Sequence, residues 1–306
     1  MLSRVANSIY WMIRYLERAE NTARVINVNS HLLLDLPDSV ELGWEPIIDI
    51  LSSRDLFYEK YQQANEENVI QFMLVDQKNM GSIVSSLIFA RENARTVKEI
   101  IPREAWEQIN NLYLDVVTNQ AEGFSRRTRY SFLARIILAN QTIVGLLAGT
   151  MSHDEAYDFM KIGRNLERAD MSTRLIDVRS ASLLENVDEE LTSFKNIQWM
   201  SVLKSMTAYQ MYRRQVRMRV TREDVLNFLL LDKRFPRSLL HTFDQIEHAV
   251  SLLPNNTVCL EEIGNAKTYL ISINPSTLLQ DKLHDFIDVV QLNLSEIDNK
   301  VAQTYF

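Results

Sequence analysis

Glycine and proline are scarce in this sequence, which has 7 glycines and 6 prolines in 306 residues. An average protein of this length carries roughly 20 glycines and 15 prolines. Tight hairpins and glycine-rich phosphate loops depend on these residues, and the sequence contains neither G-x-G-x-x-G nor G-x-x-x-x-G-K-S/T. A fold that binds a dinucleotide or a nucleoside triphosphate through such a loop is therefore disfavoured.

Cysteine and long apolar runs are equally sparse. The one cysteine, Cys259, excludes an internal disulfide framework and a multi-cysteine zinc site, and it fits a reducing cytoplasm. The longest apolar runs fall far short of the roughly 20 residues that span a bilayer, and the first residues lack the pattern of a signal peptide. A formal charge of -7 with 24% charged residues is typical of a soluble globular protein. We therefore expect a cytoplasmic protein with no membrane partner.

Apolar residues recur with helical spacing from the start of the sequence. Val5, Ile9, Met12 and Leu16 begin a seam spaced by four and three residues, which predicts a long helix over residues 3–35 that ends before Pro37. In no long segment do apolar and polar residues alternate with the period of two that is typical of strands. We therefore expect ten to fourteen helices and essentially no sheet. Four helix starts are indicated by residues that favour N-cap positions, namely Ser82, Ser152, Thr221 and Ser238.

Two parts of the sequence are similar to each other. The segment 14–34 matches the segment 164–184, and the run FMLVDQKNMGSI, which begins at Phe72, matches FLLLDKRFPRSL, which begins at Phe228. Two matches in the same order and at nearly the same displacement predict a duplicated unit. We expect one domain, residues 1–306, with internal repeats at about 1–150 and 151–306. The predicted fold class is an all-α, internally duplicated multi-helix bundle in which two long central helices lie side by side about a pseudo-twofold axis.

Charged residues cluster on both copies of the long helix, in the runs LERAE and LERAD, and a related run, ARENAR, lies between them. One interpretation is a lattice of salt bridges that sets the register of the central helices. The other is a charged cleft between the copies, in which arginines bind a carboxylate or phosphate and glutamates bind an amine. The candidate residues are Arg14, Glu17, Arg18, Glu20, Arg24, Arg91, Glu92, Arg95, Arg164, Glu167, Arg168, Asp170 and Arg174.

The runs YWMIRYLERAENTAR, ARENAR, GRNLERADMSTRLIDV and FLLLDKRFPRS resemble those of the alpha-E family of bacterial helical proteins. One departure is Asn165, where an aromatic residue like Tyr15 is more usual. Members of that family are typically encoded beside a circularly permuted ATP-grasp protein and often a transglutaminase-like protein. The resemblance therefore implies a role in an ATP-dependent amide-forming or peptide-modifying system. It implies these proteins as partners and ATP on the ligase, with no cofactor on this chain. The family motif maps onto Glu17, Arg18, Glu20, Arg24, Glu167, Arg168, Asp170 and Arg174.

Three functions remain open from the sequence. The first is an accessory subunit that holds a peptide or amino-acid-like group in the charged cleft and works with the ligase. The second is an enzyme that uses Glu17 or Glu167 as a general base; we rank it lower, because nearby arginines lower the pKa of a carboxylate and make it a poor base. The third is a structural helical scaffold. A homo-oligomer is compatible with all three.

Other clusters of residues are weaker indications of function. Five arginines lie close together at 213–222, and Arg126, Arg127 and Arg129 form a second group. The chain as a whole is acidic and has no nucleic-acid motif, so we expect solvated or interface faces and no nucleic-acid partner. None of the five histidines follows a glutamate with the Glu-x-x-His spacing of di-iron bundles, so no metal is expected. Cys259 is expected to be a buried, inert thiol.

Overall fold

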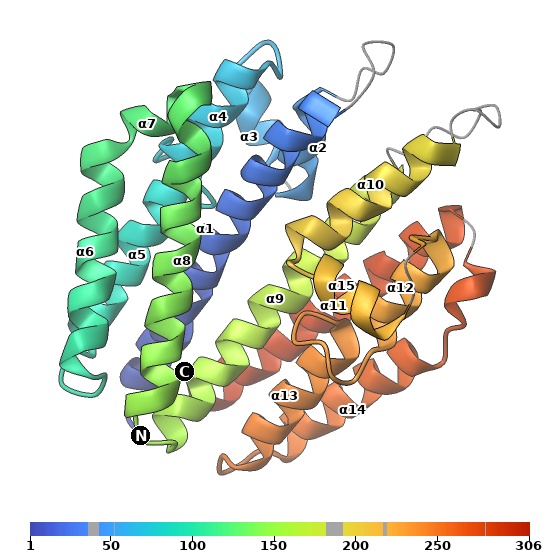
Figure 1. Ribbon diagram of the computed structural model, residues 1–306. Helices are drawn as coiled ribbons and strands as arrows, with labels where there is room; N and C mark the ends of the chain where they lie inside the picture. The colour runs from blue at the N-terminus through green and yellow to red at the C-terminus, as the bar shows by residue number, and fades with distance from the viewer. Residues whose placement is uncertain (36–42, 52, 182–191, 217–218, 279) are drawn as a thin grey trace. The chain divides into compact units, whose positions relative to one another are not determined.

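The computed structural model describes the chain except for residues 36–42, 52, 182–191, 217–218 and 279 (Figure 1). The regular secondary structure of the described part is all helical, with fifteen α-helices, one 3-10 turn and no strand. The all-α prediction is confirmed, and the number of helices exceeds the predicted range by one. The elements are α1 (Ser3–Asp35), α2 (Glu45–Ile50), α3 (Arg54–Tyr58), α4 (Glu66–Leu74), α5 (Ile83–Thr96), α6 (Arg103–Asn119), α7 (Ala121–Phe124), α8 (Arg126–Thr150), α9 (Glu155–Ala181), α10 (Thr192–Ser205), α11 (Tyr209–Gln215), α12 (Arg222–Leu231), α13 (Leu239–Ser251), α14 (Thr257–Ile271), η2 (Pro275–Thr277) and α15 (Gln280–Tyr305).

The chain divides into two compact units. Unit 1 is Met1–Glu167 together with Tyr305–Phe306, and unit 2 is Arg168–Thr304. The division therefore lies inside α9, whereas the repeat boundary predicted from the sequence lies near Thr150, between α8 and α9. The single domain and its two repeats stay predictions.

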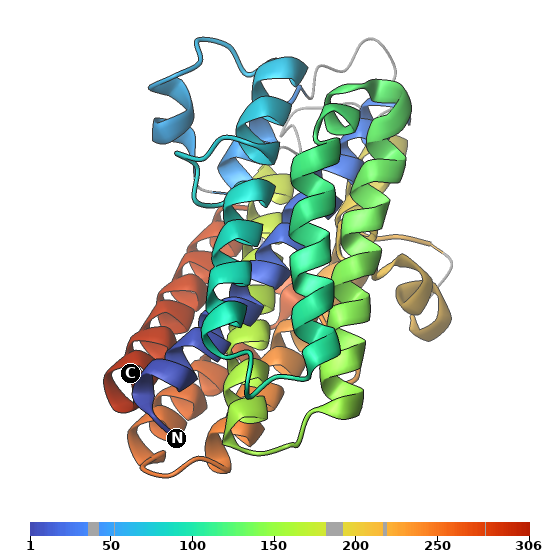
Figure 2. The same cartoon turned by 90° about the vertical axis from the view of Figure 1, so that its left-hand side faces the viewer.

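Unit 1 is built on four long helices. Helix α1 packs on α5 and α8, α5 packs on α6, and α6 packs on α8. Figure 2 looks onto this unit, with the teal helix α5 and the green helices α6 and α8 side by side. Tyr10, Ile13 and Val25 lie outside the main apolar seam of α1 and are nevertheless almost completely buried. Helix α1 is therefore enclosed on several sides, as its apolar flanks predict.

The first part of α9 also belongs to unit 1 and lies directly against α1. A Cβ added at Gly163 would stand 2.7 Å from the backbone oxygen of Tyr10 and 3.1 Å from a methyl carbon of Ile13. Only a residue without a Cβ lets the two backbones approach this closely. Gly163 thus sets the distance between these helices.

In unit 2, helices α12, α13 and α14 pack on one another, and α10 packs on α11 and α12. Two local contacts of unit 1 recur there. Thr22 donates a hydrogen bond to the carbonyl oxygen of Gly81 at 3.4 Å, and Ser172 donates one to that of Arg237 at 3.1 Å. Ser172 occupies the place of Thr22 in the first sequence match, and Arg237 that of Gly81 in the second. The recurrence favours the predicted duplication, which stays an inference.

Three of the four predicted N-caps are confirmed. The hydroxyls of Ser82, Thr221 and Ser238 accept hydrogen bonds from backbone N–H groups of the first turns of α5, α12 and α13. The prediction for Ser152 is wrong. The side chain of Asp154 accepts the N–H of Ala156 instead, at 3.0 Å, because Asp154 stands directly before the first residue of α9.

Among the described helices, α8 has the length and composition that crossing a membrane requires, and a third of its most apolar stretch is buried in the structure. A core helix of a soluble protein passes the same test, and α8 packs on α1, α6 and α7. The expectation of no membrane partner stays a prediction.

Candidate functional site

The carboxylate of Glu167 on α9 lies at the centre of an ion-pair cluster in unit 1. Arg18 meets it with two nitrogens, Nε at 2.6 Å from Oε1 and Nη2 at 3.0 Å from Oε2. The Nε of Arg14 lies 3.0 Å from Oε2. Both carboxylate oxygens are therefore engaged, and only 2% of the Glu167 side chain is exposed.

A second ion pair runs in the opposite sense between the same two helices. The Nε of Arg164 on α9 lies 3.4 Å from Oε2 of Glu17 on α1, whose side chain is 1% exposed. In the sequence match between the two helices, Arg14 corresponds to Arg164 and Glu17 to Glu167. Each helix thus gives an arginine to the other's glutamate, the reciprocal pattern expected of two copies related by a twofold axis.

The arginines determine the ionisation of this cluster. Burial by itself would raise the pKa of Glu167, but the charges of Arg18 and Arg14 and their hydrogen bonds outweigh it and hold this pKa below its ordinary value. The guanidinium of Arg14 also lies 4.6 Å from the centre of the Trp11 ring and donates a hydrogen bond to the Tyr10 hydroxyl. Glu167 is therefore an ionised and enclosed carboxylate, which makes it a weak base at neutral pH.

Four of the other predicted site residues on α1 and α9 form pairs along their own helix. Glu20 and Arg24 form a buried pair at 2.6 Å within α1. In unit 2, Asp170 and Arg174 pair at 2.9 Å along α9, and Arg168 is buried. Among the ion pairs that the structure describes between α1 and α9, the partners are Arg14, Glu17, Arg18, Arg164 and Glu167.

The third predicted cluster, on α5, is separate from these five. Arg95 pairs with Glu92 at 2.7 Å, and Arg91 reaches Asn110 of α6 at 2.8 Å. Among the described residues, the hydrogen bonds and ion pairs of Arg91, Glu92 and Arg95 go to residues of α5 and α6, not to α1 or α9. The likeness of ARENAR to the LERAE motif does not place these side chains in the same cluster.

Two further side-chain clusters were not predicted as sites from the sequence. In unit 2, His284 of α15 lies between two aspartates, with Nδ1 at 2.8 Å from Asp177 and Nε2 at 3.6 Å from Asp288. The ligand-type atoms of the three residues lie within 4.8 Å of one another, a spacing that can hold a metal ion. In this structure both ring nitrogens face carboxylates, so the arrangement is that of a charged histidine. No local motif signals it, because Asp177 and His284 are 107 positions apart.

We expect His284 to make the stability of unit 2 depend on pH. The hydrogen bond to Asp177 and the charges of Asp177 and Asp288 raise the pKa of His284 in the folded protein. Its stabilisation is then complete below the unfolded value of about 6.5 and is lost as the pH rises through the folded value. Titrating the ring by NMR should give a midpoint above about 6.5. The midpoint should move down in Asp177→Asn, and an unchanged midpoint in that variant would contradict the assignment.

The second of these clusters lies in unit 1. Arg126 and Arg129, which the sequence favours as members of a solvated or interface face, both bind Glu66 of α4, and a pocket opens beside them. Of the arginines at 213–222, Arg217 lies outside the described residues, and Arg213, Arg214 and Arg219 are exposed. Cys259 is buried as expected, and burial raises the pKa of its thiol.

A known protein family shares the glutamate–arginine motif of this chain. The model of the Alpha-E family, described as a predicted alpha-helical domain with a conserved ER motif, matches residues 1–306. The dipeptide Glu-Arg occurs here at Glu17–Arg18 and Glu167–Arg168, and both of these glutamates are buried.

Curated relatives are known from mycobacteria. An uncharacterised protein of Mycobacterium bovis is 23% identical over 272 residues, which are 83% of this chain and 30% of the relative. An uncharacterised protein of Mycobacterium tuberculosis is 22% identical over the same share of each chain. This chain therefore spans about 30% of the length of the relatives it matches, and no solved structure matches it. Because the family model covers every residue, the chain belongs to the Alpha-E family.

Proposed function

We propose that this chain is a non-catalytic accessory subunit of an ATP-grasp-linked system that forms amides or modifies peptides. Its arginines on α1 and α9 would hold a peptide or amino-acid-like group while the partner ligase hydrolyses ATP. A transglutaminase-like protein would be a further partner. The family resemblance suggests this setting. The matched region is only 30% of the length of the relatives, which is consistent with a helical domain that works beside other domains.

The observation that carries the accessory role is the enclosure of Glu167. A general base needs access to the substrate and a pKa near the working pH. Glu167 has neither, because two arginines occupy its oxygens and lower its pKa. This argues against the enzyme that uses Glu17 or Glu167.

Contact with a ligand is left to the arginines. The side chains of Arg18 and Arg164 are 23% and 28% exposed, whereas Glu17 and Glu167 are enclosed. Arginine binds carboxylate and phosphate groups through paired N–H donors. The glutamates of this cluster would therefore orient the arginines, and an amine of the ligand would have to find another acceptor.

The test uses the full chain and an ATP-grasp protein of the kind that family members are typically encoded beside. We expect the two to co-purify and to form a complex measurable by calorimetry. In the complex, Arg164→Gln should lower product formation by the ligase about tenfold, the loss expected for one charge-assisted contact. The matched control is Arg103→Gln, which removes an exposed arginine of a surface pair on α6 and should change nothing. Turnover of a defined substrate by the isolated chain, lost in Glu167→Gln, would contradict the proposal.

A structural scaffold is the second candidate, and the same enclosure favours it. If the ion pairs serve only to hold α1 and α9 together, Arg164→Gln lowers the stability of the chain and leaves ligase activity unchanged at a temperature where the variant is folded. Measuring thermal unfolding alongside activity separates the two candidates.

A further inference from the structure

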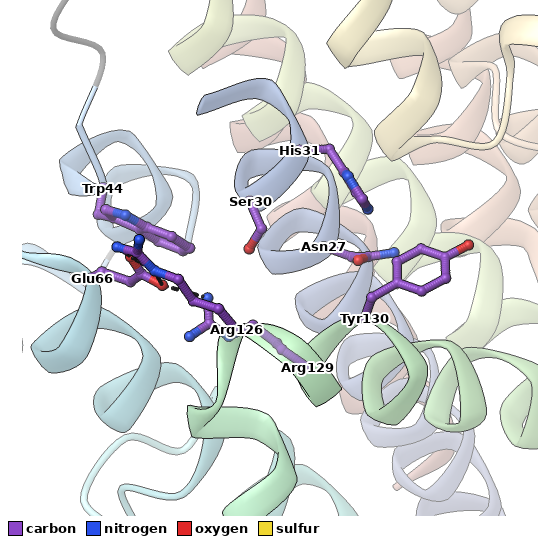
Figure 3. Close-up of a pocket in the computed structure, with 8 residues that line it drawn as sticks. All are labelled: Asn27, Ser30, His31, Trp44, Glu66, Arg126, Arg129 and Tyr130. Atoms are coloured by element: carbon purple, nitrogen blue, oxygen red, sulfur yellow. Dashed lines mark hydrogen bonds and ion pairs between the residues drawn. The ribbon is translucent and has the colours of Figure 1, made fainter. Parts of the chain in front are cut away.

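A pocket of about 280 Å³ opens in unit 1, away from the glutamates of α1 and α9 (Figure 3). Asn27, Ser30 and His31 come from the last turns of α1, and Trp44 stands just before α2. The remaining lining residues lie at two helix starts, Glu66 on α4 and Arg126, Arg129 and Tyr130 on α8. This volume is close to the lower end for small-molecule sites, which run from about 300 to 1,000 Å³.

The pocket carries one net positive charge. Glu66 is the acceptor for both arginines, with Arg129 Nη1 at 2.7 Å from Oε1 and Arg126 Nε at 2.9 Å from Oε2. Burial opposes ionisation of Glu66, but these hydrogen bonds and charges outweigh it and lower its pKa. Two guanidinium groups thus share one carboxylate, and a single further negative charge would neutralise the group.

The two arginines have different roles. Arg129 is 5% exposed, and its nitrogens donate to Glu66 and to the carbonyl oxygens of Gly123 and Phe124, so it is held in place. The Arg126 side chain is 82% exposed. It binds Glu66 through Nε and Nη2, and its Nη1 has no recorded partner among the described residues. Arg126 therefore keeps donors for a ligand.

Helix ends add to the positive potential. Helices α4 and α8 begin at residues that line the pocket, and the N-terminus of a helix carries partial positive charge on its N–H groups. The N-cap residue of α8, Ser125, makes no side-chain cap hydrogen bond. The start of α8 thus lacks the acceptor that capped helices such as α5 have.

Aromatic side chains line the pocket on two sides, with Trp44 beside Glu66 and Tyr130 opposite (Figure 3). Trp44 is 7% exposed, and the guanidinium of Arg129 lies 5.8 Å from the centre of its ring. Tyr130 stands edge-on to His31, with ring centres 5.2 Å apart. Figure 3 shows Asn27 close to Tyr130, on the side of the pocket opposite Glu66. An apolar or aromatic group can lie between these rings, while the amide of Asn27 and the hydroxyl of Ser30 can offer hydrogen bonds.

On the inferred duplication, α15 of unit 2 is the counterpart of α8 and lacks this arrangement. Helix α15 repeats the spacing of the buried positions of α8, with Phe286 in place of Phe132 and Ile297 in place of Ile143. In the same register, unit 2 has Leu283 at the position of Arg129, and this leucine is completely buried. Burying an arginine costs more than burying a leucine, because the charge loses its hydration. The arginine of unit 1 therefore points to a site rather than to packing.

We propose that this pocket binds a small molecule or chain end that carries one carboxylate next to an apolar or aromatic group. The Nη1 edge of Arg126 receives the carboxylate, and Trp44 and Tyr130 hold the apolar part. The single net charge favours a carboxylate over a doubly charged phosphate. A free acylated amino acid and a peptide C-terminus share this chemistry. A second hollow of about 420 Å³, also lined by Glu66, Arg126 and Arg129, has room for the rest of a peptide. The inference does not rest on the proposed accessory function.

The test is calorimetric titration of the full chain with probes that differ in one group. N-acetyl-L-phenylalanine should bind saturably, and its amide, N-acetyl-L-phenylalaninamide, should bind about tenfold more weakly or not at all, because one charge-assisted hydrogen bond is lost. The tripeptide Ala-Ala-Phe with a free C-terminus tests the peptide source. Tighter binding of the tripeptide identifies a peptide end as the ligand, and tighter binding of the acetylated amino acid identifies the free molecule.

The matched variants are Arg126→Gln and Arg127→Gln. Both arginines are exposed neighbours at the start of α8, so neither change should prevent folding. Of the two, only Arg126 lines the pocket. Arg126→Gln should weaken binding of the carboxylate probe about tenfold, and Arg127→Gln should leave it unchanged. Equal effects of the two variants, equal binding of acid and amide, or no saturable binding of either carboxylate overturns the proposal. Tighter binding of inorganic phosphate overturns the choice of a carboxylate.

Discussion

Replacing Glu167 with glutamine should lower the free energy of unfolding by about 3–5 kcal/mol, the usual cost of removing one partner from a buried ion pair. The variant keeps the shape of the side chain and removes its charge, which leaves Arg14 and Arg18 without the carboxylate that both bind. Burial disfavours an uncompensated guanidinium, and the remaining amide donors of glutamine would face the same arginine donors. Urea denaturation followed by circular dichroism measures the change.

The control for this prediction is Glu92→Gln on α5. Glu92 also pairs with arginine, but the side chains of Glu92 and Arg95 are 44% and 65% exposed. Water screens such a pair, so the loss should stay within about 1 kcal/mol. A Glu167→Gln variant as stable as Glu92→Gln would show that the cluster on α1 and α9 contributes no more than a surface ion pair.

Replacing Gly163 with alanine should destabilise the protein by about 1–3 kcal/mol, the range for overpacking a filled interior. The new methyl group would lie 2.7 Å from the backbone oxygen of Tyr10 and 3.0 Å from a carbon of its ring. A backbone atom in the middle of a long helix cannot move aside like the end of a flexible side chain, so α9 itself must shift. A shift also lengthens the contacts between Glu167 and the arginines of α1, which adds to the loss. Thermal and urea unfolding measure the change.

The same substitution should have the opposite effect on stability at Gly145 of α8. A Cβ at Gly145 meets no atom within 4 Å. Alanine is the better helix former by about 0.5–1 kcal/mol, so Gly145→Ala should stabilise the protein by about that amount. If Gly163→Ala were also stabilising, α1 and α9 would not be in contact at the distance that the structure shows.

Much of the candidate site was visible in the sequence, because it depends on local spacing. Residues three and four apart on a helix share a face, so the positions of Arg14, Glu17 and Arg18 already placed them together. The match between the two LERA-containing segments indicated a second helix of the same kind. Whether these charges form a lattice or an open cleft depends on burial. In unit 1 the structure encloses Glu17 and Glu167 and leaves the arginines partly exposed.

The division of roles between sequence and tertiary structure follows from the range of the interactions. The scarcity of glycine and proline, the period of the apolar residues and the capping side chains act within a few residues, and they determined an all-helical chain, the extent of α1 and three of four predicted caps. The unit boundary inside α9, the Glu66–Arg126–Arg129 pocket and the pairing of Asp177 with His284 were decided by tertiary structure alone. Glu66 and Arg126 lie 60 positions apart, and Asp177 and His284 lie 107 positions apart. Only packing of distant helices, driven by burial of their apolar faces, brings such side chains together.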